Sequence, residues 1–183
     1  RGALRHRTVQ LMCGRYAASA STADLVEEFE VDEDRTLEPA RSVLAAPQDP
    51  PPGQPDYNMA PTKQAAVVLT RRPREAGTAG AAAPPTAAPV RQLRLLTWGL
   101  VPSWATGVSM GLRLINARAE TVRSKPAFRK ILGVRRALIP ADGWYEWQQS
   151  PVATDAKGKP RKQPFFISRA DGHGLAFGGL YEF

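Results

Sequence analysis

The chain contains a single cysteine, Cys13, which directly follows Met12 in the stretch QLMCGRYA. If Met12 is a start residue that is removed, Cys13 carries a free α-amine beside its thiol. Reference pKa values of about 7.7–8.0 for an α-amine and about 8.5 for a thiol leave both groups partly nucleophilic near neutral pH. Such an aminothiol condenses with an aldehyde to an imine, and its thiol then closes a thiazolidine ring intramolecularly. The alternative is a buried and inert cysteine, the common fate of a lone one.

A second group suited to chemistry is Glu146, within the stretch IPADGWYEW at 139–147. A positioned carboxyl group can take a proton from one oxygen and give it to another. In a strand, alternation places Glu146 on the face of Trp144 and opposite the neighbouring rings of Tyr145 and Trp147. The alternative is an ordinary exposed strand glutamate.

The composition narrows the class of protein. The chain has 183 residues, 43% of them hydrophobic, which is enough for one domain with its own core. A formal net charge of +8 favours nucleic acid as partner, with a solvated basic surface as the alternative. A single cysteine excludes a disulfide framework and a cysteine-rich zinc site, and it suits a reducing compartment. We expect no membrane partner, because no apolar run reaches the roughly 18 residues of a spanning helix.

Sequence patterns predict short elements that would position these residues. Ser21, with Asp24 three residues later, is a capping signal for a helix over 21–31, and Ser124 similarly caps a helix over 124–132. Further predictions are a strand over 64–70, a strand running into a proline turn over 93–104, a short helix or turn over 116–122, strands on both sides of an Asp-Gly turn over 135–149, and a hairpin around 170–174.

Short strands outnumber helices, which predicts an α+β fold with a curled, mainly antiparallel, barrel-like sheet and a few short peripheral helices. We expect flexible loops at about 37–57, 73–91 and 150–162. Residues 1–11 lack the apolar core of a secretory signal and are interpreted as a non-native or over-extended leader. Residues 12–183 then form a single domain, which we expect to be truncated at its C-terminal end because its last strand runs to Phe183.

Five stretches occur in a fixed order along the chain: MCGRYA from Met12, NMAPT from Asn58, WGLVPSW from Trp98, NARAET from Asn116, and IPADGWYEW. With these motifs the sequence strongly resembles the SOS response-associated peptidase family. Members of that family crosslink covalently to abasic sites in single-stranded DNA. The resemblance covers roughly Met12 to Phe183, and it implies an abasic-site sensor that shields the lesion in the DNA damage response.

The resemblance also implies residue roles. Cys13 matches the N-terminal nucleophile that forms the thiazolidine with the ring-opened sugar. Asn116 matches the residue that hydrogen-bonds at the reaction centre, although a turn or helix-cap role is an equally ordinary interpretation. Glu146 matches the acid and base that helps to open the deoxyribose ring.

The same resemblance implies a DNA-binding set. Arg15 and Arg118 match phosphate clamps, a role that suits bidentate arginine. Asn58 is expected either to contact DNA or to stabilise a turn. Trp98 and Trp104 would stack on bases or wedge against a duplex end, with burial in the core as the alternative. The expected partner is single-stranded DNA containing abasic sites, bound by a monomer with no metal or organic cofactor, in the cytoplasm or on the nucleoid of a bacterium.

The chain departs from the family pattern at one catalytic position. The family carries a histidine in a segment resembling HxRMP, whereas this chain holds only His6 and His173, and neither matches. Truncation and divergence are the two explanations, and either predicts slower ring opening. Thr97 also stands where the family often has a basic residue.

Two other functions stay open at this stage. One is an N-terminal-nucleophile cysteine peptidase or amidohydrolase, and the other is a non-catalytic nucleic-acid-binding module in which Cys13 is structural. If residues 1–12 stay attached, Cys13 has an amide in place of an amine, and no imine can form.

Overall fold

A computed structural model describes residues 14–39, 44, 47–72 and 88–182. Cys13, residues 1–12 and most of the alanine- and proline-rich stretch at 73–91 lie outside the described residues. Within the described ranges, no helix is long and apolar enough to cross a bilayer.

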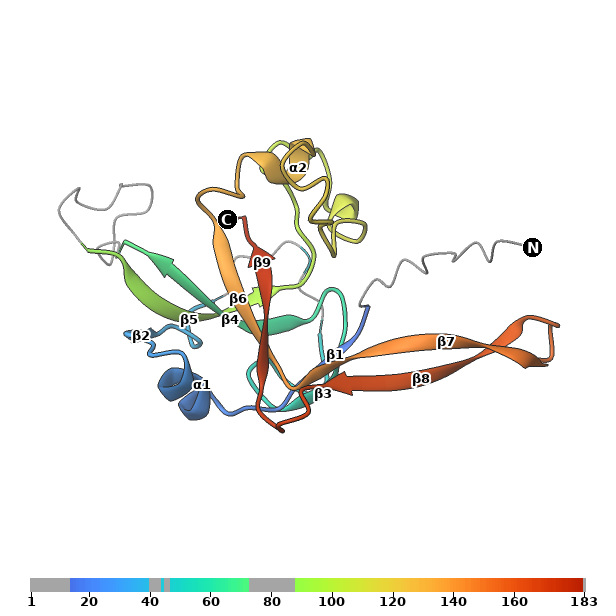
Figure 1. Cartoon of the computed structure of the whole chain (residues 1–183). Helices are drawn as coiled ribbons and strands as arrows, with labels where there is room; N and C mark the ends of the chain where they lie inside the picture. The colour runs from blue at the N-terminus through green and yellow to red at the C-terminus, as the bar shows by residue number, and fades with distance from the viewer. Residues whose placement is uncertain (1–13, 40–43, 45–46, 73–87, 183) are drawn as a thin grey trace, which may run out of the picture.

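Two sheets make up the body of the molecule (Figure 1). The first is antiparallel, in the order β3-β1-β7-β8. Its strands are β1 (Tyr16–Ala18), β3 (Asp56–Met59), β7 (Gly143–Thr154) and β8 (Pro160–Ser168). The second has the order β2-β5-β4-β6-β9, and only its β2–β5 pair is parallel. Its strands are β2 (Glu33–Asp34), β4 (Gln64–Arg71), β5 (Val90–Thr97), β6 (Arg136–Ala141) and β9 (Leu175–Leu180).

Helices are few and short in the described part of the chain. They are α1 (Thr22–Glu28), the 3-10 helix η1 (Val108–Met110) and α2 (Pro126–Arg129). The predicted α+β class, with a mainly antiparallel sheet and short peripheral helices, is confirmed. In the described residues the strands form two adjoining sheets rather than one closed barrel.

The capping signal of the first helix is confirmed in detail. The Ser21 hydroxyl accepts a hydrogen bond from the Asp24 amide at 3.2 Å, and the Asp24 carboxylate accepts one from the Ser21 amide at 3.1 Å. These bonds satisfy donors at the helix start that would otherwise lack partners. The helix buries Leu25 against Val68 and Leu93, which fixes α1 on the second sheet.

The cap predicted at Ser124 is wrong. The N-cap of α2 is Lys125, which makes no side-chain capping bond. The Ser124 hydroxyl instead donates to the Thr121 carbonyl at 3.0 Å, because the preceding chain already forms a tight turn. The helix is therefore shorter than the predicted span of 124–132.

The chain crosses from one sheet to the other at Asp142. The strands predicted around the Asp-Gly turn exist, but β6 pairs with β4 and β9, whereas β7 pairs with β1 and β8. The Asp142 amide donates to the Ala17 carbonyl and its carboxylate accepts from the Ser19 amide, both at 2.8 Å. The Asp-Gly pair thus joins two sheets through β1 instead of closing a hairpin.

Two further predictions about hairpins need correction. Residues 150–154 and 160–162, expected in a polar loop, are strand residues of a long β7–β8 hairpin that projects from the body (Figure 1). The pairing is irregular between Gln149 and Thr154, where the Ser150 hydroxyl accepts from the amides of Val152 and Ala153. The hairpin predicted around 170–174 does not form, because β9 leaves β8 and pairs with β6 along its whole length.

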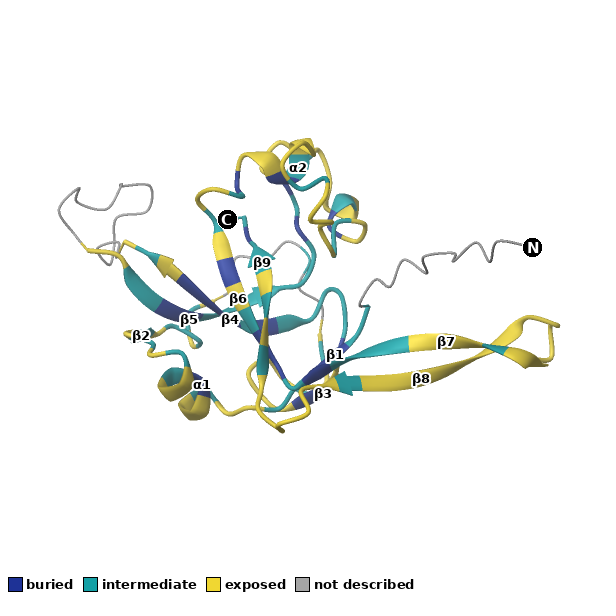
Figure 2. Ribbon diagram, in the orientation of Figure 1, coloured by how far each residue is buried: buried dark blue, intermediate teal, exposed yellow. Residues whose placement is uncertain are grey.

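The core that supports the site lies where the two sheets meet. Tyr16 and Met59 from the first sheet pack against Ala65 and Ala141 from the second. Trp98, Trp144 and Phe177 lie around this cluster. Figure 2 shows buried segments concentrated in this central region and exposed residues along the outer β7–β8 hairpin.

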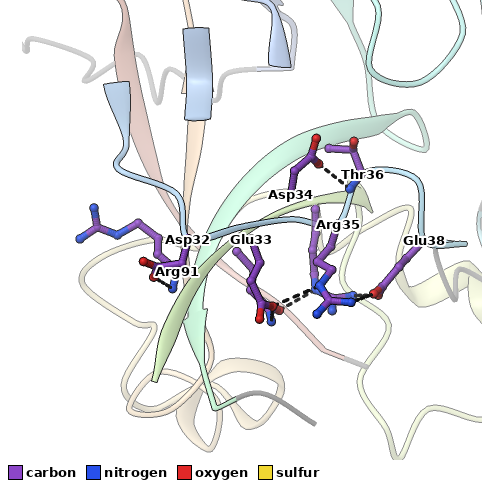
Figure 3. A network of polar contacts seen from close by, with 9 residues as sticks. Asp32, Glu33, Asp34, Arg35, Thr36, Glu38 and Arg91 are labelled. Carbon is purple, nitrogen blue, oxygen red and sulfur yellow. Dashed lines mark hydrogen bonds and ion pairs between the residues drawn. The ribbon is translucent and has the colours of Figure 1, made fainter. Parts of the chain in front are cut away.

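A network of charged side chains fastens the β2 segment to β5 (Figure 3). Arg35 bonds to Glu33 at 3.1 Å and to Glu38 at 2.7 Å, and Arg94 reaches the second oxygen of Glu38 at 2.8 Å. Burial by itself would raise the pKa of Glu38. The bonds and positive charges of Arg35 and Arg94 outweigh that effect and hold the pKa below its ordinary value.

Candidate active site

Two residues predicted to contact DNA meet beside the first strand. Arg15 Nη1 donates a hydrogen bond to Asn58 Oδ1 at 2.6 Å. Arg15 immediately precedes β1 and Asn58 lies in β3, and the pairing of Tyr16 with Met59 brings them together. Asn58 is exposed and Arg15 is half-buried, so the pair lies at the surface close to the position of Cys13 in the sequence.

A buried ion pair supports the strand that carries Asn58. Asp56 is only 3% exposed, and its Oδ2 lies 2.6 Å from Lys63 Nζ. The other oxygen, Oδ1, accepts from the Asn58 amide at 2.8 Å. Lys63 also donates to the Asp49 carbonyl at 2.9 Å. The NMAPT motif therefore lies between the two partners of a buried charge pair.

Sequence reasoning did not identify this ion pair. Its signal is visible in the stretch DYNMAPTK, in which an acidic and a basic residue flank the motif at 56 and 63. A charged residue at each end of a loop motif is common, and only the burial of Asp56 distinguishes this pair from a surface one.

Trp98 connects the core to the chain that carries Asn116. Its ring centroid lies 5.4 Å from that of Tyr16, and its indole N–H donates to the Ile115 carbonyl at 2.6 Å. Because Ile115 directly precedes Asn116, this bond holds the backbone next to Asn116. Trp98 is half-buried, with one side in the core and the other toward a cavity.

The cavity has a volume of about 640 Å³ and lies between the second sheet and the segment from Trp98 to Ala117. Tyr16, Trp98 and Asn116 all line it. The buried Thr97 hydroxyl on its wall makes no hydrogen bond within the described part of the chain. Asn116 is an exposed residue, so its amide belongs to the solvent-accessible rim of the cavity.

Glu146 belongs to the first sheet. It is half-buried in β7, opposite Phe165 of β8, and it is not among the described residues that line the cavity. Trp144, two residues earlier, packs edge-on against Phe177 with ring centroids 6.1 Å apart. Tyr145 and Trp147 have their rings 6.4 Å apart, in keeping with the predicted alternation.

The remaining DNA-binding candidates lie in turns. Trp104 is 54% exposed and follows Pro102, whose carbonyl accepts from the Ala105 amide at 2.8 Å, as the predicted proline turn requires. Arg118 is exposed, and its carbonyl accepts bonds from two later amides in the turn at 116–122.

The structure therefore describes seven of the eight predicted site residues. It joins Arg15 with Asn58 and places Trp98 and Asn116 on one cavity. Arg118 and Trp104 are exposed in turns, Glu146 is half-buried in β7, and Cys13 lies outside the described residues. The described residues hold no group of three histidine, cysteine, aspartate or glutamate side chains able to bind a metal.

Comparison with known families settles the relationship that the five motifs indicate. The family model described as "SOS response associated peptidase (SRAP)" matches residues 12–183. The chain belongs to this family. Three relatives named abasic site processing proteins are each 32% identical: YoaM of Bacillus subtilis over 173 residues, YedK of Escherichia coli over 162, and HMCES of Rattus norvegicus over 124.

These alignments cover most of the SRAP-family chain but only part of each relative. The alignment with YoaM covers 93% of the chain and 60% of YoaM. The alignment with YedK covers 88% of the chain and 55% of YedK, and that with HMCES covers 66% of the chain and 31% of HMCES. The chain thus spans about 60% of the length of the Bacillus relative that it matches.

Solved structures share the fold. A protein from Bacteroides thetaiotaomicron superposes with a TM-score of 0.60 at 18% identity, over 92% of the chain and 59% of that protein. A phage-related protein from Bordetella bronchiseptica superposes with a TM-score of 0.51 at 30% identity, over 92% of the chain and 60% of that protein.

Proposed function

We propose that this SRAP-family chain processes abasic sites in single-stranded DNA by forming a covalent thiazolidine between Cys13 and the ring-opened sugar. The observation that carries the proposal is the position of Cys13, directly after Met12 and two residues before the Arg15–Asn58 pair. Family membership and the names of the relatives support the choice of lesion.

The proposed chemistry balances without an oxidant or a reductant. The lone pair of the Cys13 α-amine attacks the C1′ aldehyde, and loss of water gives an imine. The Cys13 sulfur then adds to the imine carbon, and the nitrogen takes up a proton as the five-membered ring closes. The second step is intramolecular and therefore benefits from a high effective concentration.

Two described residues have proposed roles near this reaction. Glu146 moves protons between the sugar oxygens during ring opening and helps to expel water from the carbinolamine. Asn116, at the rim of the cavity, hydrogen-bonds to the sugar or the amine and orients it. The same imine gives access to lyase-type strand cleavage, so ring closure must outpace elimination for the lesion to be shielded.

Phosphate binding is assigned to arginine. Arg15 is oriented by its 2.6 Å bond to Asn58, and Arg118 is exposed in its turn. Both can bind phosphate oxygens through a charged, planar guanidinium. Binding of this kind does not read base sequence, and its affinity falls as salt rises.

The chemistry requires a free amine on Cys13, so the peptide bond between Met12 and Cys13 must be cleaved. The family description as a peptidase is consistent with removal of preceding residues by the chain itself. We expect the natural chain to lose residues 1–12 and the Cys13→Ala variant to keep them. That difference would assign the cleavage to the Cys13 side chain.

Intact mass spectrometry tests the proposal directly. The protein is analysed alone and after incubation with single-stranded DNA that contains one abasic site, with undamaged DNA as the control. We expect a mass that begins at Cys13 and a denaturant-resistant adduct that forms only with the abasic strand. The Cys13→Ala variant should keep non-covalent binding and lose the adduct. An adduct formed by protein that still carries Arg1 would contradict the proposed ring closure.

A further inference from the structure

The β7–β8 hairpin carries aromatic side chains on one of its faces. In the strand register, Tyr145 is opposite Phe166 and Trp147 is opposite Pro164. Because directly opposite residues share a face and alternate residues return to it, Tyr145, Trp147 and Phe166 lie together. The Tyr145 ring centroid is 5.0 Å from that of Phe166 and 6.4 Å from that of Trp147. These three residues are hereafter the aromatic face.

The aromatic face is exposed. Phe166 is 47% exposed and Trp147 is 39% exposed, and neither belongs to a core cluster of the described residues. Figure 2 shows that the hairpin around them is exposed along its outer length. Adjacent aromatic side chains left open to solvent are typical of a binding surface rather than of a core.

Cationic residues lie at both ends of the aromatic face. At its base, the Tyr145 amide donates to the Arg15 carbonyl at 3.0 Å, so Arg15 and its partner Asn58 adjoin the rings. Farther out along the hairpin, Lys162 is opposite Gln149. Lys162 lies two residues before Pro164 in β8, so its side chain is on the same side of the hairpin as the aromatic face. Four residues of strand from Tyr145 to Gln149 span about 13 Å.

We propose that the aromatic face is a stacking platform for unpaired bases of single-stranded DNA, made of other residues than those proposed for the reaction. The choice of this polymer rests on the proposed function. Exposed rings that stack on bases, with cations alongside for the phosphates, are the common means of binding single strands without sequence preference. A second copy of this chain could also cover the rings, but cations at both ends favour a polyanion.

Phe165 and Phe166 form a matched pair for the test. They are neighbours in β8, they are 49% and 47% exposed, and alternation points them to opposite faces. Affinity for a fluorescent, undamaged oligothymidine is measured by anisotropy for the natural chain, Phe166→Ala and Phe165→Ala. We expect Phe166→Ala to weaken binding by about 5- to 150-fold, the usual effect of losing a stacked ring, and Phe165→Ala to bind like the natural chain.

A charge variant supplies a second readout. Lys162→Gln should lower the slope of log affinity against log salt by about one, the contribution of a single phosphate contact. Circular dichroism confirms that each variant keeps its strands. Equal weakening by both phenylalanine variants, or no weakening by Phe166→Ala, overturns the platform. A change in sedimentation mass of Phe166→Ala without a change in DNA affinity overturns it in favour of a contact between two copies.

The two proposals can fail separately in this design. Undamaged DNA carries no aldehyde, so the platform is measured without any adduct. If binding depends on Phe166 but no adduct forms on abasic DNA, only the proposed crosslinking fails. If an adduct forms but undamaged-strand binding is indifferent to Phe166, only the platform fails.

Discussion

Asp56 and Lys63 form an ion pair of 2.6 Å, and the Asp56 carboxylate is almost wholly buried at the start of β3, the strand that carries Asn58. The pair lies 7 residues apart in sequence and encloses the NMAPT motif. The position of Asn58, and through it the orientation of Arg15, therefore depends on a charge pair whose carboxylate is buried and whose lysine side chain is 19% exposed.

Removing one member of this pair should be costly. Lys63→Met leaves the buried Asp56 carboxylate without its cation, and we expect the free energy of unfolding to fall by about 3–5 kcal/mol. Urea denaturation followed by tryptophan fluorescence measures the change. The control is Asp171→Asn, which breaks the exposed pair with Arg169 and should leave the unfolding midpoint near that of the natural chain. Equal effects of the two substitutions would show that burial of Asp56 does not matter.

Arg15 and Asn58 should contribute differently to DNA binding. Arg15→Gln removes one phosphate contact, so the salt dependence of binding should fall by a slope of about one. Asn58→Ala removes only the group that orients the guanidinium and should lower affinity while the slope stays the same. Anisotropy titrations at several salt concentrations separate the two results. A change of slope in Asn58→Ala would mean that Arg15 no longer reaches the phosphate.

Glu146 should affect the rate of crosslinking rather than the strength of binding. Glu146→Gln keeps the shape of the side chain but cannot exchange protons, so adduct formation should slow by about 10²- to 10⁴-fold. Gel-based time courses on abasic single-stranded DNA measure the rate. The matched control is Gln148→Ala, which should crosslink at the natural rate. Gln148 is exposed in the hairpin and lies on the same face of β7 as Glu146. A fall in non-covalent affinity without a fall in rate would contradict the assigned role.

The network around Glu38 should make stability depend on acidity. Its pKa is lower in the folded protein than the ordinary value of 4.5, so its contribution is present above that pH and is lost as the pH falls through the folded value. The stability difference between the natural chain and Glu38→Gln should therefore shrink from neutral pH toward acid. Thermal unfolding of both proteins across that range measures the difference, and a gap that widens in acid would contradict the prediction.

Local signals predicted the elements better than their partners. The pair Ser21 and Asp24 predicts α1, and apolar runs predict β4 and β5. These signals work because capping and strand burial depend on residues that are close together in the sequence. The Asp142–Gly143 pair looks the same in a sequence whether it closes a hairpin or passes between two sheets. Only the pairing of β6 with β9, far along the chain, decides between these outcomes.

The candidate site was predictable one residue at a time. Arg15 and Asn58 were identified through motifs, but their contact spans 43 residues and depends on how β1 pairs with β3. The Asp56–Lys63 pair was not predicted, because its importance comes from the burial of Asp56. The sequence pattern of a charged residue does not show whether its side chain is buried. The exposure of Trp147 and Phe166 in the β7–β8 hairpin was not predicted, since aromatic side chains carry no signal that separates a buried strand from a projecting one.

Strand β1 lies between β3 and β7, so the segment next to Cys13 gains its second neighbour only after most of the polypeptide has been made. Such distant pairing is slow to form. During synthesis β1 is then paired on one side at most, which leaves time for the bond before Cys13 to be cleaved before the sheet closes. Pulse-labelling hydrogen exchange should show the amide of Ala17, a residue whose backbone faces β7, gaining protection together with β7 and not earlier.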